Sequence, residues 1–352
     1  MRAGARALLA VLLALAGLGA CAPAESQGPV IALLLPEAKA SRYEGIDRPV
    51  FERVVAARCA DCTVLYANAG QDAARQQQQA ESALTQGASV LVIDAVDASA
   101  ARSIVTSAAA RGVRVVAYDR FVADAPLDFM VGSDVERVGQ LQGEALVRAV
   151  GRVDADGGIL VVDGAETDPN VALLQSGLAE ALEGTGLTVL ARYSTPDWSP
   201  DKAQEWVQGQ LTQYQGRVVG VYAANDGTAG GAISAMRAAG LDPVPPVTGQ
   251  DADLAAVQRI ISGDQTMTVY KAIEQQARTA AEIAVRLARG EQPAATAEVE
   301  GVPAILLAPV AVTSGNVGSV LVDGGVYSVE EICVEPYRQA CLDLDLIRVE
   351  AG

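Results

Sequence analysis

The chain has 352 residues, of which 50% are hydrophobic and 20% are charged, a composition typical of a globular protein long enough for two domains. Its formal net charge of −17 argues against nucleic acid as a partner, because phosphate contacts need clustered Lys and Arg. Histidine is absent, which excludes Ser-His-Asp, Cys-His and HExxH sites, so an enzyme of this sequence would have to rely on carboxylates.

The first residues, MRAGARALLAVLLALAGLGAC, have the pattern of an export signal. Arg2 and Arg6 precede an apolar run at 7–16 that is too short for a confident membrane span. The LGAC ending resembles the lipobox of bacterial lipoproteins, in which the cysteine, here Cys21, is diacylated and becomes the new N-terminus. A plain signal peptide with an incidental cysteine is the alternative. Residues 22–28 read as a polar tether, so we expect a mature protein that is lipid-anchored on the outer face of the cell membrane.

From residue 29 onward, short apolar runs alternate with helical patterns. This alternation predicts parallel sheets that are covered by helices on both faces. It resumes after about residue 132, which predicts two similar lobes. The expected strands are 30–35, 63–67, 89–93, 113–118, 129–132, 158–162, 187–193, 217–223, 244–249 and 266–270. The expected helices are 47–58, 73–87, 99–112, 136–150, 170–184, 201–214, 227–240 and one that runs through Ile261.

Four cysteines remain after the export signal: Cys59, Cys62, Cys333 and Cys341. An even number in an oxidising compartment favours two local disulfides. The CADC motif at 59–62 could instead be redox-active or half of a metal site. A redox motif is expected at a helix N-terminus after a strand, whereas CADC follows a helical pattern, so structural disulfides are the preferred interpretation.

Polar residues follow the predicted strands, where open parallel sheets bind their ligands. They are Asp94, Asp119, Arg120, Asp163, Asn225, Asp226, Gln250 and Asp251. Asp and Asn also cap helix N-termini, and we interpret Asp94, Asp163 and Asp226 in that way. Arg120 cannot cap an N-terminus and would be repelled by the helix dipole. The pair of Asp119 and Arg120 therefore predicts a ligand clamp, in which carboxylate accepts and guanidinium donates.

No nucleotide or calcium motif accompanies these groups. GTAGGA lacks the phosphate-loop and dinucleotide signatures, DADL and DADG lack further calcium ligands, and the glutamines at 76–79 fit the polar face of a helix. We therefore expect no cofactor and no metal. The aromatic residues Tyr43, Tyr193 and Trp198 could cover the apolar face of a sugar ring. Together with the polar residues at the strand ends, they suit a neutral polyol as ligand.

Three stretches carry a resemblance to a known family: 115–147, 224–236 and GQDADLAAVQRIISGDQTMTVYK at 249–271. They resemble the type I periplasmic sugar-binding proteins of ABC importers, and among these the D-xylose-binding proteins, over nearly the whole mature chain. The resemblance implies an α/β fold of two Rossmann-like lobes with parallel sheets, joined by a three-strand hinge, with the sugar in the cleft. The implied lobes are 29–131 plus 272–308, and 132–271 plus 309–345.

The resemblance also implies a ligand site. Its residues are Arg42, Tyr43, Asp119, Arg120, Asn170, Trp198, Asn225, Asp251 and Lys271. Where the family commonly has Trp for its first stacking residue, this chain has Tyr43 in a segment one residue longer, which leaves the preferred aldose open. Each of three residues has an alternative role outside the ligand site. Trp198 could be an aromatic residue at a lobe edge, Asn170 a helix cap, and Lys271 a solvated strand end. Asp253 is expected to cap a helix and not to contact ligand.

The implied function is that of a monomeric binding protein that captures xylose or a similar aldose and delivers it to a membrane permease with its ATPase. Two other functions stay open. One is an exported glycosidase or sugar-modifying enzyme that uses two carboxylates, for instance Asp119 and Asp251. The other is a sensor that presents the sugar to a membrane receptor, which the sequence does not distinguish from import.

Overall fold

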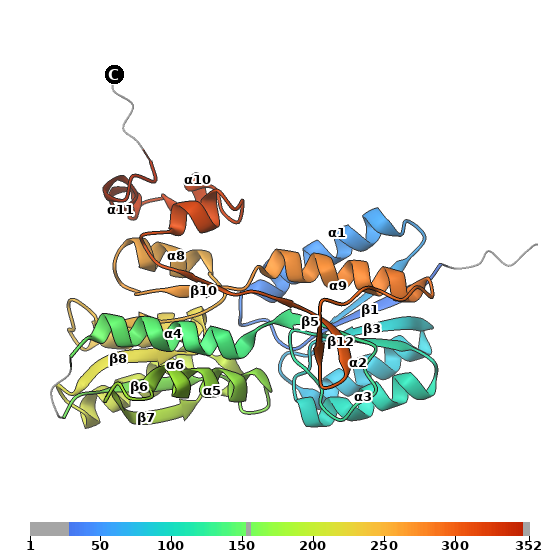
Figure 1. Cartoon of the computed structure of the whole chain (residues 1–352), viewed down its shortest axis with the longest axis horizontal. Helices are drawn as coiled ribbons and strands as arrows, with labels where there is room; N and C mark the ends of the chain where they lie inside the picture. The colour runs from blue at the N-terminus through green and yellow to red at the C-terminus, as the bar shows by residue number, and fades with distance from the viewer. Residues whose placement is uncertain (1–27, 153–155, 348–352) are drawn as a thin grey trace, which may run out of the picture.

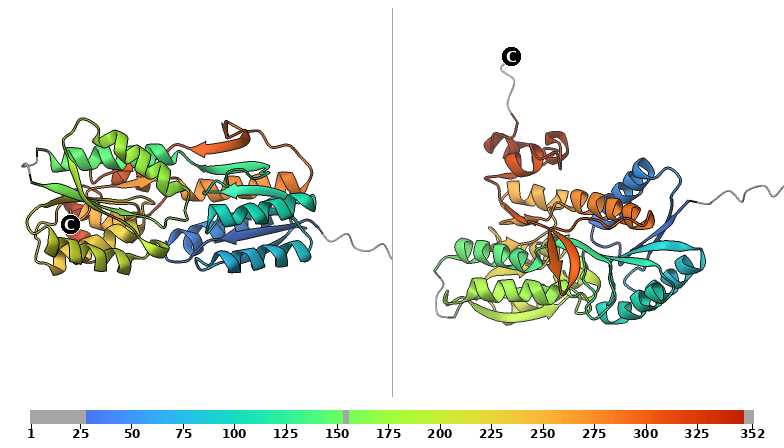
Figure 2. Two further views of the ribbon diagram at one scale, coloured as in Figure 1. Left: turned by 90° about the horizontal axis from the view of Figure 1, so that it is seen from below. Right: turned by 45° about the vertical axis from the view of Figure 1, so that its right-hand side comes forward.

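The computed structural model describes residues 28–152 and 156–347. The expected export signal, Cys21 and all but the last residue of the tether lie outside the described residues. Within these two described ranges, no helix is both long and apolar enough to cross a membrane. The two lobes lie end to end along the long axis of the molecule (Figures 1 and 2).

The first lobe is built on a seven-stranded sheet with the order β11-β12-β5-β4-β3-β1-β2. All neighbouring strands are parallel except β11, which pairs antiparallel with β12 at the edge. The strands are β1 (Val30–Leu35), β2 (Thr63–Asn68), β3 (Ala88–Ile93), β4 (Arg114–Tyr118), β5 (Phe129–Ser133), β11 (Ala297–Val299) and β12 (Val302–Leu307). The helices are α1 (Arg48–Arg58), α2 (Ala73–Thr85), α3 (Ala98–Ala110) and α9 (Ile273–Ala288).

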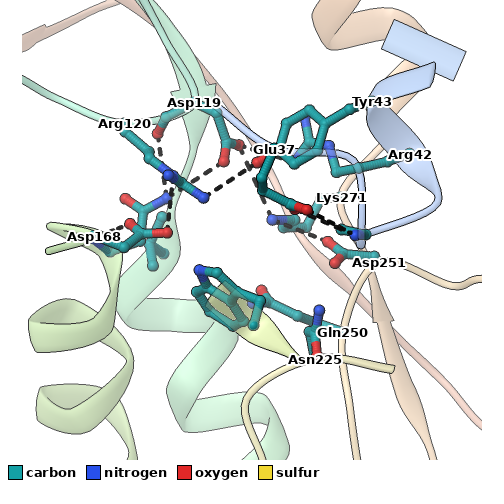
Figure 3. Close-up of a pocket in the computed structure, with 14 residues that line it drawn as sticks. Glu37, Arg42, Tyr43, Asp119, Arg120, Asp168, Asn225, Gln250, Asp251 and Lys271 are labelled. Atoms are coloured by element: carbon teal, nitrogen blue, oxygen red, sulfur yellow. Dashed lines mark hydrogen bonds and ion pairs between the residues drawn. The ribbon is translucent and has the colours of Figure 1, made fainter. Parts of the chain in front are cut away.

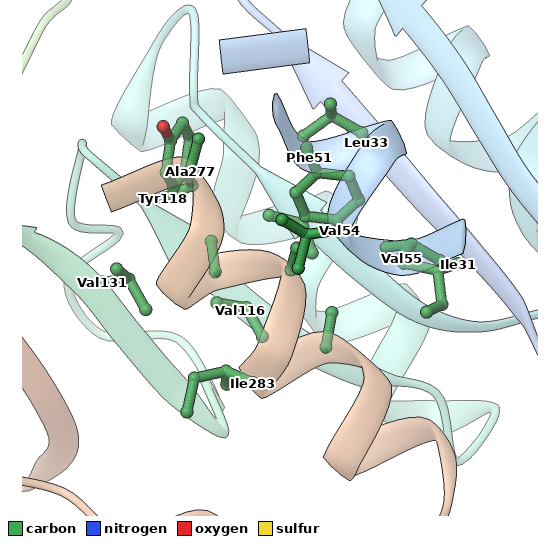
Figure 4. Close-up of a cluster of buried hydrophobic side chains, with 14 of the residues drawn as sticks. Ile31, Leu33, Phe51, Val54, Val55, Val116, Tyr118, Val131, Ala277 and Ile283 are labelled. Carbon is green, nitrogen blue, oxygen red and sulfur yellow. The ribbon is translucent and has the colours of Figure 1, made fainter. Parts of the chain in front are cut away.

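The period-two pattern of the strands places two hydrophobic cores on the two faces of this sheet. Ile31 and Leu33 of β1 pack with α1 and α9 (Figure 4). Ala32 and Leu34, which alternate with them, pack with α2 and α3. Because both faces of β1 are covered, the strand reads as an uninterrupted apolar run, as expected for a parallel sheet.

The second lobe repeats this design on a four-stranded parallel sheet with the order β7-β6-β8-β9. Glycines allow close packing of the helices: a Cβ at Gly139 would lie 2.3 Å from the Leu174 carbonyl oxygen, and one at Gly177 would lie 2.0 Å from that of Glu136. The strands are β6 (Gly158–Asp163), β7 (Thr188–Ser194), β8 (Val218–Ala223) and β9 (Val247–Thr248). The helices are α4 (Val135–Val150), α5 (Asn170–Leu182), α6 (Pro200–Gln213), α7 (Asp226–Ala238) and α8 (Leu254–Ile261).

The chain passes between the lobes after β5, after β10 (Thr268–Tyr270) and after β12, and β10 pairs antiparallel with β13 (Val310–Val312). The predicted fold class, two parallel-sheet lobes joined by three crossings, is confirmed. The tail forms η3 (Gly318–Val322), α10 (Val329–Ile332) and α11 (Arg338–Asp343), which pack on α8. Disulfides join Cys333 to Cys341 in this tail and Cys59 to Cys62 at the end of α1.

The predicted strands and helices agree with the structure except for one strand, and several observed elements were not predicted. The expected strand at 244–249 shrinks to Val247–Thr248, because Pro245 and Pro246 have no N–H to donate to a ladder. None of the elements after Lys271 was predicted: α9, β11, β12, β13, α10 and α11. They lie in the part of the chain that returns between the lobes and forms the tail, where the simple alternation of strand and helix breaks down.

Candidate functional site

A cavity lies between the lobes, at the carboxyl ends of both sheets (Figure 3). About 390 Å³ of space between the side chains that line it, part of it open to solvent, is not filled by protein atoms. The structure brings all nine predicted ligand residues into its lining. The complete lining is Glu37, Ala40, Arg42, Tyr43, Asp119, Arg120, Val135, Asp168, Asn170, Trp198, Asn225, Gln250, Asp251 and Lys271.

Loops that follow the strands position these side chains, and three of the residues have a strained backbone. The φ angles are 61° at Asp119, 54° at Trp198 and 97° at Asp251, all in the left-handed region that side chains other than glycine rarely adopt. Such conformations cost about 1–3 kcal/mol each and gather at ligand sites, where the surrounding structure holds them. Three lining residues are thus held in backbone conformations that cost stability.

Arg42 and Asp119 form a buried ion pair on the first lobe. Arg42 Nη1 lies 3.1 Å from Asp119 Oδ1, and its Nε and Nη2 bind the two oxygens of Asp47 at 2.9 and 3.0 Å. The Tyr118 hydroxyl donates a further hydrogen bond to Asp47. Burial alone would raise the pKa of Asp119, but the charges of Arg42 and Lys271 outweigh it and hold this pKa well below its usual range. Asp119 is therefore an ionised hydrogen-bond acceptor.

Arg120 joins the two lobes. Its Nε lies 2.8 Å from Oδ2 of Asp168 on the second lobe and 3.2 Å from Oδ1 of Asp94 on the first. Its Nη1 donates to the Ala95 carbonyl oxygen at 2.8 Å, and its Nη2 donates to the Tyr43 hydroxyl at 3.3 Å. The guanidinium is 2% exposed, and its three nitrogens all lie close to a polar partner in the protein. The predicted clamp is thus also a cross-lobe strut.

The interpretation of Asp94 and Asp163 as helix caps is wrong. Asp97 caps α3, while Asp94 lies fully buried against Arg120, and burial raises its pKa. Asp163 accepts from Arg192 Nη1 at 3.0 Å and from Gln175 Nε2 at 3.1 Å. Both carboxylates therefore contact an arginine side chain instead of the backbone of the following helix.

The same interpretation is wrong for Asp226. Asn225 is the cap of α7, since its Oδ1 accepts from the backbone N–H of Thr228 at 2.9 Å. Asp226 instead accepts from Gln265 Nε2 at 2.8 Å and from the Thr268 hydroxyl at 2.7 Å. These bonds tie the start of α7 to the segment of β10 that leads to the lobe crossing.

Lys271 and Asp251 meet at this crossing. Lys271 Nζ lies 3.0 Å from Asp251 Oδ1 and 4.0 Å from Asp119 Oδ1. Burial lowers the pKa of Lys271, but the two carboxylates outweigh it and raise this pKa above its usual value. Since Lys271 is 4% exposed, it is not a solvated strand end. Asn170 starts α5 but does not cap it, and its Nδ2 lies 3.4 Å from Asp119 Oδ2.

Asp253 also differs from the prediction. It stands at the cap position of α8 but makes no side-chain capping bond. Its Oδ1 accepts instead from the Ser41 hydroxyl of the first lobe at 2.6 Å. Burial and the charge of Asp251 raise the pKa of Asp253 to about 6. The residue expected to be a cap is therefore a contact between lobes beside the cavity.

Trp198 is the cavity's large aromatic residue. Its ring lies over Gly164, where an added Cβ would stand 2.1 Å from Cζ2, and it is 7% exposed, so it is not a surface aromatic. Trp198 Nε1 and Gln250 Oε1 are buried without a hydrogen-bond partner among the described residues. Both are groups that a polar ligand can satisfy. Tyr193 does not belong to this site, because it stacks on Trp206 at a centroid distance of 5.3 Å.

Sequence reasoning missed two charged residues of the lining. Glu37 follows β1, accepts backbone hydrogen bonds from Lys39 and Ala40, and has a pKa raised by burial. Asp168 stands two residues before Asn170 in the same DPN stretch. Glu37 could have been predicted as a ligand residue, because it follows a strand end as the other candidates do. No group of three or more Asp, Glu, Cys or His residues within the described ranges could hold a metal ion.

Comparisons with known proteins agree with this architecture. Residues 31–292 match the family model described as "Periplasmic binding protein domain". The chain is 36% identical to a D-xylose-binding periplasmic protein of Haemophilus influenzae, with 88% of this chain and 93% of that protein covered. It is 34% identical to the one of Escherichia coli, with 86% and 92% covered.

A solved structure gives the same result in three dimensions. A carbohydrate transporter solute-binding protein of Chloroflexus aurantiacus, in complex with D-glucose, superposes with a TM-score of 0.76 at 28% identity. The alignment covers 87% of this chain and 98% of that protein. With a family model that matches most of the chain and relatives above 30% identity over most of their length, the chain belongs to the periplasmic binding protein family.

Proposed function

We propose that the protein captures a neutral monosaccharide, D-xylose or a similar aldose, between its two lobes and delivers it to an ABC permease. The observation that carries this proposal is a cavity lined by both lobes in which every cation already has a carboxylate partner. The names of the relatives support it, since two of them are D-xylose-binding periplasmic proteins.

The pairing of charges favours a neutral ligand over an anionic one. Arg42 is held by Asp47 and Asp119, Arg120 by Asp94 and Asp168, and Lys271 by Asp251 and Asp119. A sugar acid or an amino acid would bring a further negative charge to a lining in which the carboxylates already outnumber the cations. Vicinal hydroxyls, in contrast, can donate to the carboxylates and accept from the unsatisfied N–H groups without any change of charge.

The aromatic residues and the neutral amides complete a site for a pyranose. Tyr43 on the first lobe and Trp198 on the second offer apolar faces for the C–H faces of a sugar ring. Asn225 and Gln250 offer amide groups for the hydroxyls around its edge. A micromolar dissociation constant corresponds to about −8 kcal/mol, which a few charge-assisted bonds and two ring contacts can supply after the cost of ordering.

Closure of the lobes is the step that couples capture to delivery in this proposal. In the structure, Ser41 bonds to Asp253 and the Thr167 hydroxyl to the Val96 carbonyl oxygen, both across the cleft, at 2.6 and 2.9 Å. We infer that these contacts open for entry of the sugar and form again around it, with rotation at the three crossings. The ligand favours the closed form only by its higher affinity for that form.

One observation supports binding without chemistry: the relatives are named as binding proteins. Anchoring through a diacylated Cys21 on the outer face of the membrane is part of the proposal. It rests on the sequence of residues 1–21 alone.

The direct test is isothermal titration calorimetry of the mature protein with D-xylose, L-arabinose, D-ribose, D-glucose and D-galactose. D-glucuronate is the matched anionic control. We expect heat with at least one neutral aldose and none with glucuronate, and an NMR spectrum of the incubated sugar that does not change. The absence of heat with every monosaccharide would refute sugar binding, and turnover of any candidate glycoside or pentose would favour the enzyme instead.

A further inference from the structure

Helix α9 carries a buried glutamine, Gln276, whose side-chain amide contacts two of the predicted ligand residues, Asp119 and Arg42. Gln276 is fully buried and does not line the cavity. Its Nε2 donates to Asp119 Oδ1 at 3.0 Å, and its Oε1 lies 3.5 Å from Arg42 Nη2. The same Nε2 is 3.4 Å from the carbonyl oxygen of Val131. Any effect of Gln276 on a ligand must therefore pass through Asp119 and Arg42.

The contacts of Asp119 show what this amide does. An ionised carboxylate oxygen accepts about two hydrogen bonds. Oδ1 receives one from Arg42 Nη1 at 3.1 Å and one from Gln276 Nε2, so protein donors occupy it completely. Oδ2 has only Asn170 Nδ2, at 3.4 Å. The oxygen left for a hydroxyl of the ligand is Oδ2.

We propose that Gln276 is a positioning residue that fixes the rotation of the Asp119 carboxylate, so that one defined oxygen faces the ligand. This inference rests on the proposed function, since it assigns a role within the same site. Asp119 needs such support because its backbone is in a strained left-handed conformation at φ 61°, at the end of β4. Without the amide, the carboxylate can turn and share both oxygens among Arg42, Lys271 and the ligand.

The test compares two variants of Gln276 with a neighbour on the same helix. Gln276→Leu keeps the volume and removes the donor, Gln276→Glu replaces the amide by a titratable group, and Gln275→Leu changes an exposed residue one position away. Calorimetry with D-xylose measures affinity and thermal unfolding measures stability. We expect Gln276→Leu to weaken binding by roughly 10- to 100-fold, as for a lost hydrogen bond to a charged group, and Gln275→Leu to leave affinity unchanged.

The pH profile of Gln276→Glu separates positioning from a merely structural role. Asp119 and Arg42 are the charged groups that contact Gln276, while Asp47 shares Arg42 Nη2 with it and Lys271 Nζ lies 4.0 Å from Asp119 Oδ1. A protonated glutamic acid can donate to Asp119 Oδ1 as the amide does, whereas an ionised one repels that carboxylate. We therefore expect Gln276→Glu to bind D-xylose poorly at about pH 8 and to recover toward wild-type affinity at about pH 5.

Three results would overturn the proposal, and they are distinguishable. Wild-type protein that binds no monosaccharide refutes the proposed function on which the role of Gln276 rests. Wild-type protein that binds D-xylose, with a folded Gln276→Leu of equal affinity, refutes the positioning role alone. So does a Gln276→Glu variant whose affinity follows the wild-type pH profile, because a structural role changes the unfolding temperature without linking affinity to that proton.

Discussion

Gly164→Ala tests whether Trp198 contacts the ligand, because it adds only one methyl group beside the indole ring. Gly164 follows β6, and a methyl group there would lie 2.1, 2.2 and 2.5 Å from three atoms of the indole ring. Ordinary contacts begin at 3.4 Å, so the ring has to move by about 1.3 Å toward the cavity or the backbone has to shift. Because the ring is buried and offers its face and Nε1 to the cavity, we expect this displacement to disturb the ligand contact directly.

The magnitude follows from the contacts that are lost. An aromatic contact of good geometry contributes about 0.5–1.5 kcal/mol beyond its area, and overpacking costs about 1–3 kcal/mol. We therefore expect the dissociation constant for D-xylose to rise about 2- to 13-fold, and stability to fall by about 1–3 kcal/mol. The matched control is Gly209→Ala in α6, where nothing lies within 4 Å of the added methyl group; it should stabilise by up to about 1 kcal/mol without a change of affinity.

Calorimetry gives the affinity, and fluorescence reports on the ring itself. The chain has two tryptophans, Trp198 and Trp206, so a Trp206→Phe background leaves Trp198 as the only emitter of that kind. D-Xylose should change its emission, and Gly164→Ala should alter the emission of the free protein. A Gly164→Ala protein that is folded and keeps wild-type affinity would refute the assignment of Trp198 to the ligand site.

Three further predictions concern the ion pairs, the interlobe acid and the helix packing. Arg120→Lys should lower stability by about 1–3 kcal/mol in denaturant unfolding and weaken sugar binding, because an ammonium group cannot contact Asp94 and Asp168 and also donate to the Ala95 carbonyl oxygen and the Tyr43 hydroxyl. Unchanged stability would contradict the cross-lobe strut. Asp253 has a pKa raised from 3.8 to about 6, so the folded state loses stability as pH rises through this interval, by at most about 3 kcal/mol and less because the side chain is partly exposed. Asp253→Asn should thus stabilise at about pH 7.5 and be neutral at about pH 4, and equal effects at both pH values in thermal unfolding would be inconsistent with this pKa. Gly231→Ala, whose methyl group would lie 2.2 Å from the Pro200 carbonyl oxygen, should destabilise the second lobe by about 1–3 kcal/mol, and an unchanged unfolding temperature would argue against the close packing of α6 and α7.

The strands and the strand-end residues could be predicted because they depend on local patterns. The run VIALLL at 30–35 is apolar throughout because helices cover both faces of β1, and its bounds agree with the structure. Asp119, Asn225 and Asp251 were found from their places after strands. Arg42 and Asn170 do not follow from such patterns, and only the family resemblance located them. Trp198 was one of three candidate aromatic residues, and the resemblance placed it in the site.

What could not be predicted are the partners of buried polar residues, since they come from distant parts of the chain. Gln276 and Asp119 are 157 residues apart, and a glutamine in an amphipathic helix looks like a solvated residue. The glutamines at 76–79 are a second example of buried polar contacts that the sequence did not predict. They were assigned to a polar helix face, but Gln76 is buried, donates to the Asp94 carbonyl oxygen at 2.8 Å and accepts from Val96 N at 2.9 Å.

The most direct test of the central claim is a crystal structure of the protein grown with D-xylose. The account predicts electron density for one sugar ring between Tyr43 and Trp198, with a hydroxyl within hydrogen-bond distance of Asp119 Oδ2 and others near Asn225 and Gln250. It also predicts that the ion pairs of Arg42, Arg120 and Lys271 persist around the ligand. Density for the sugar elsewhere on the protein, or a cavity from which D-xylose is absent at saturating concentration, would contradict the account.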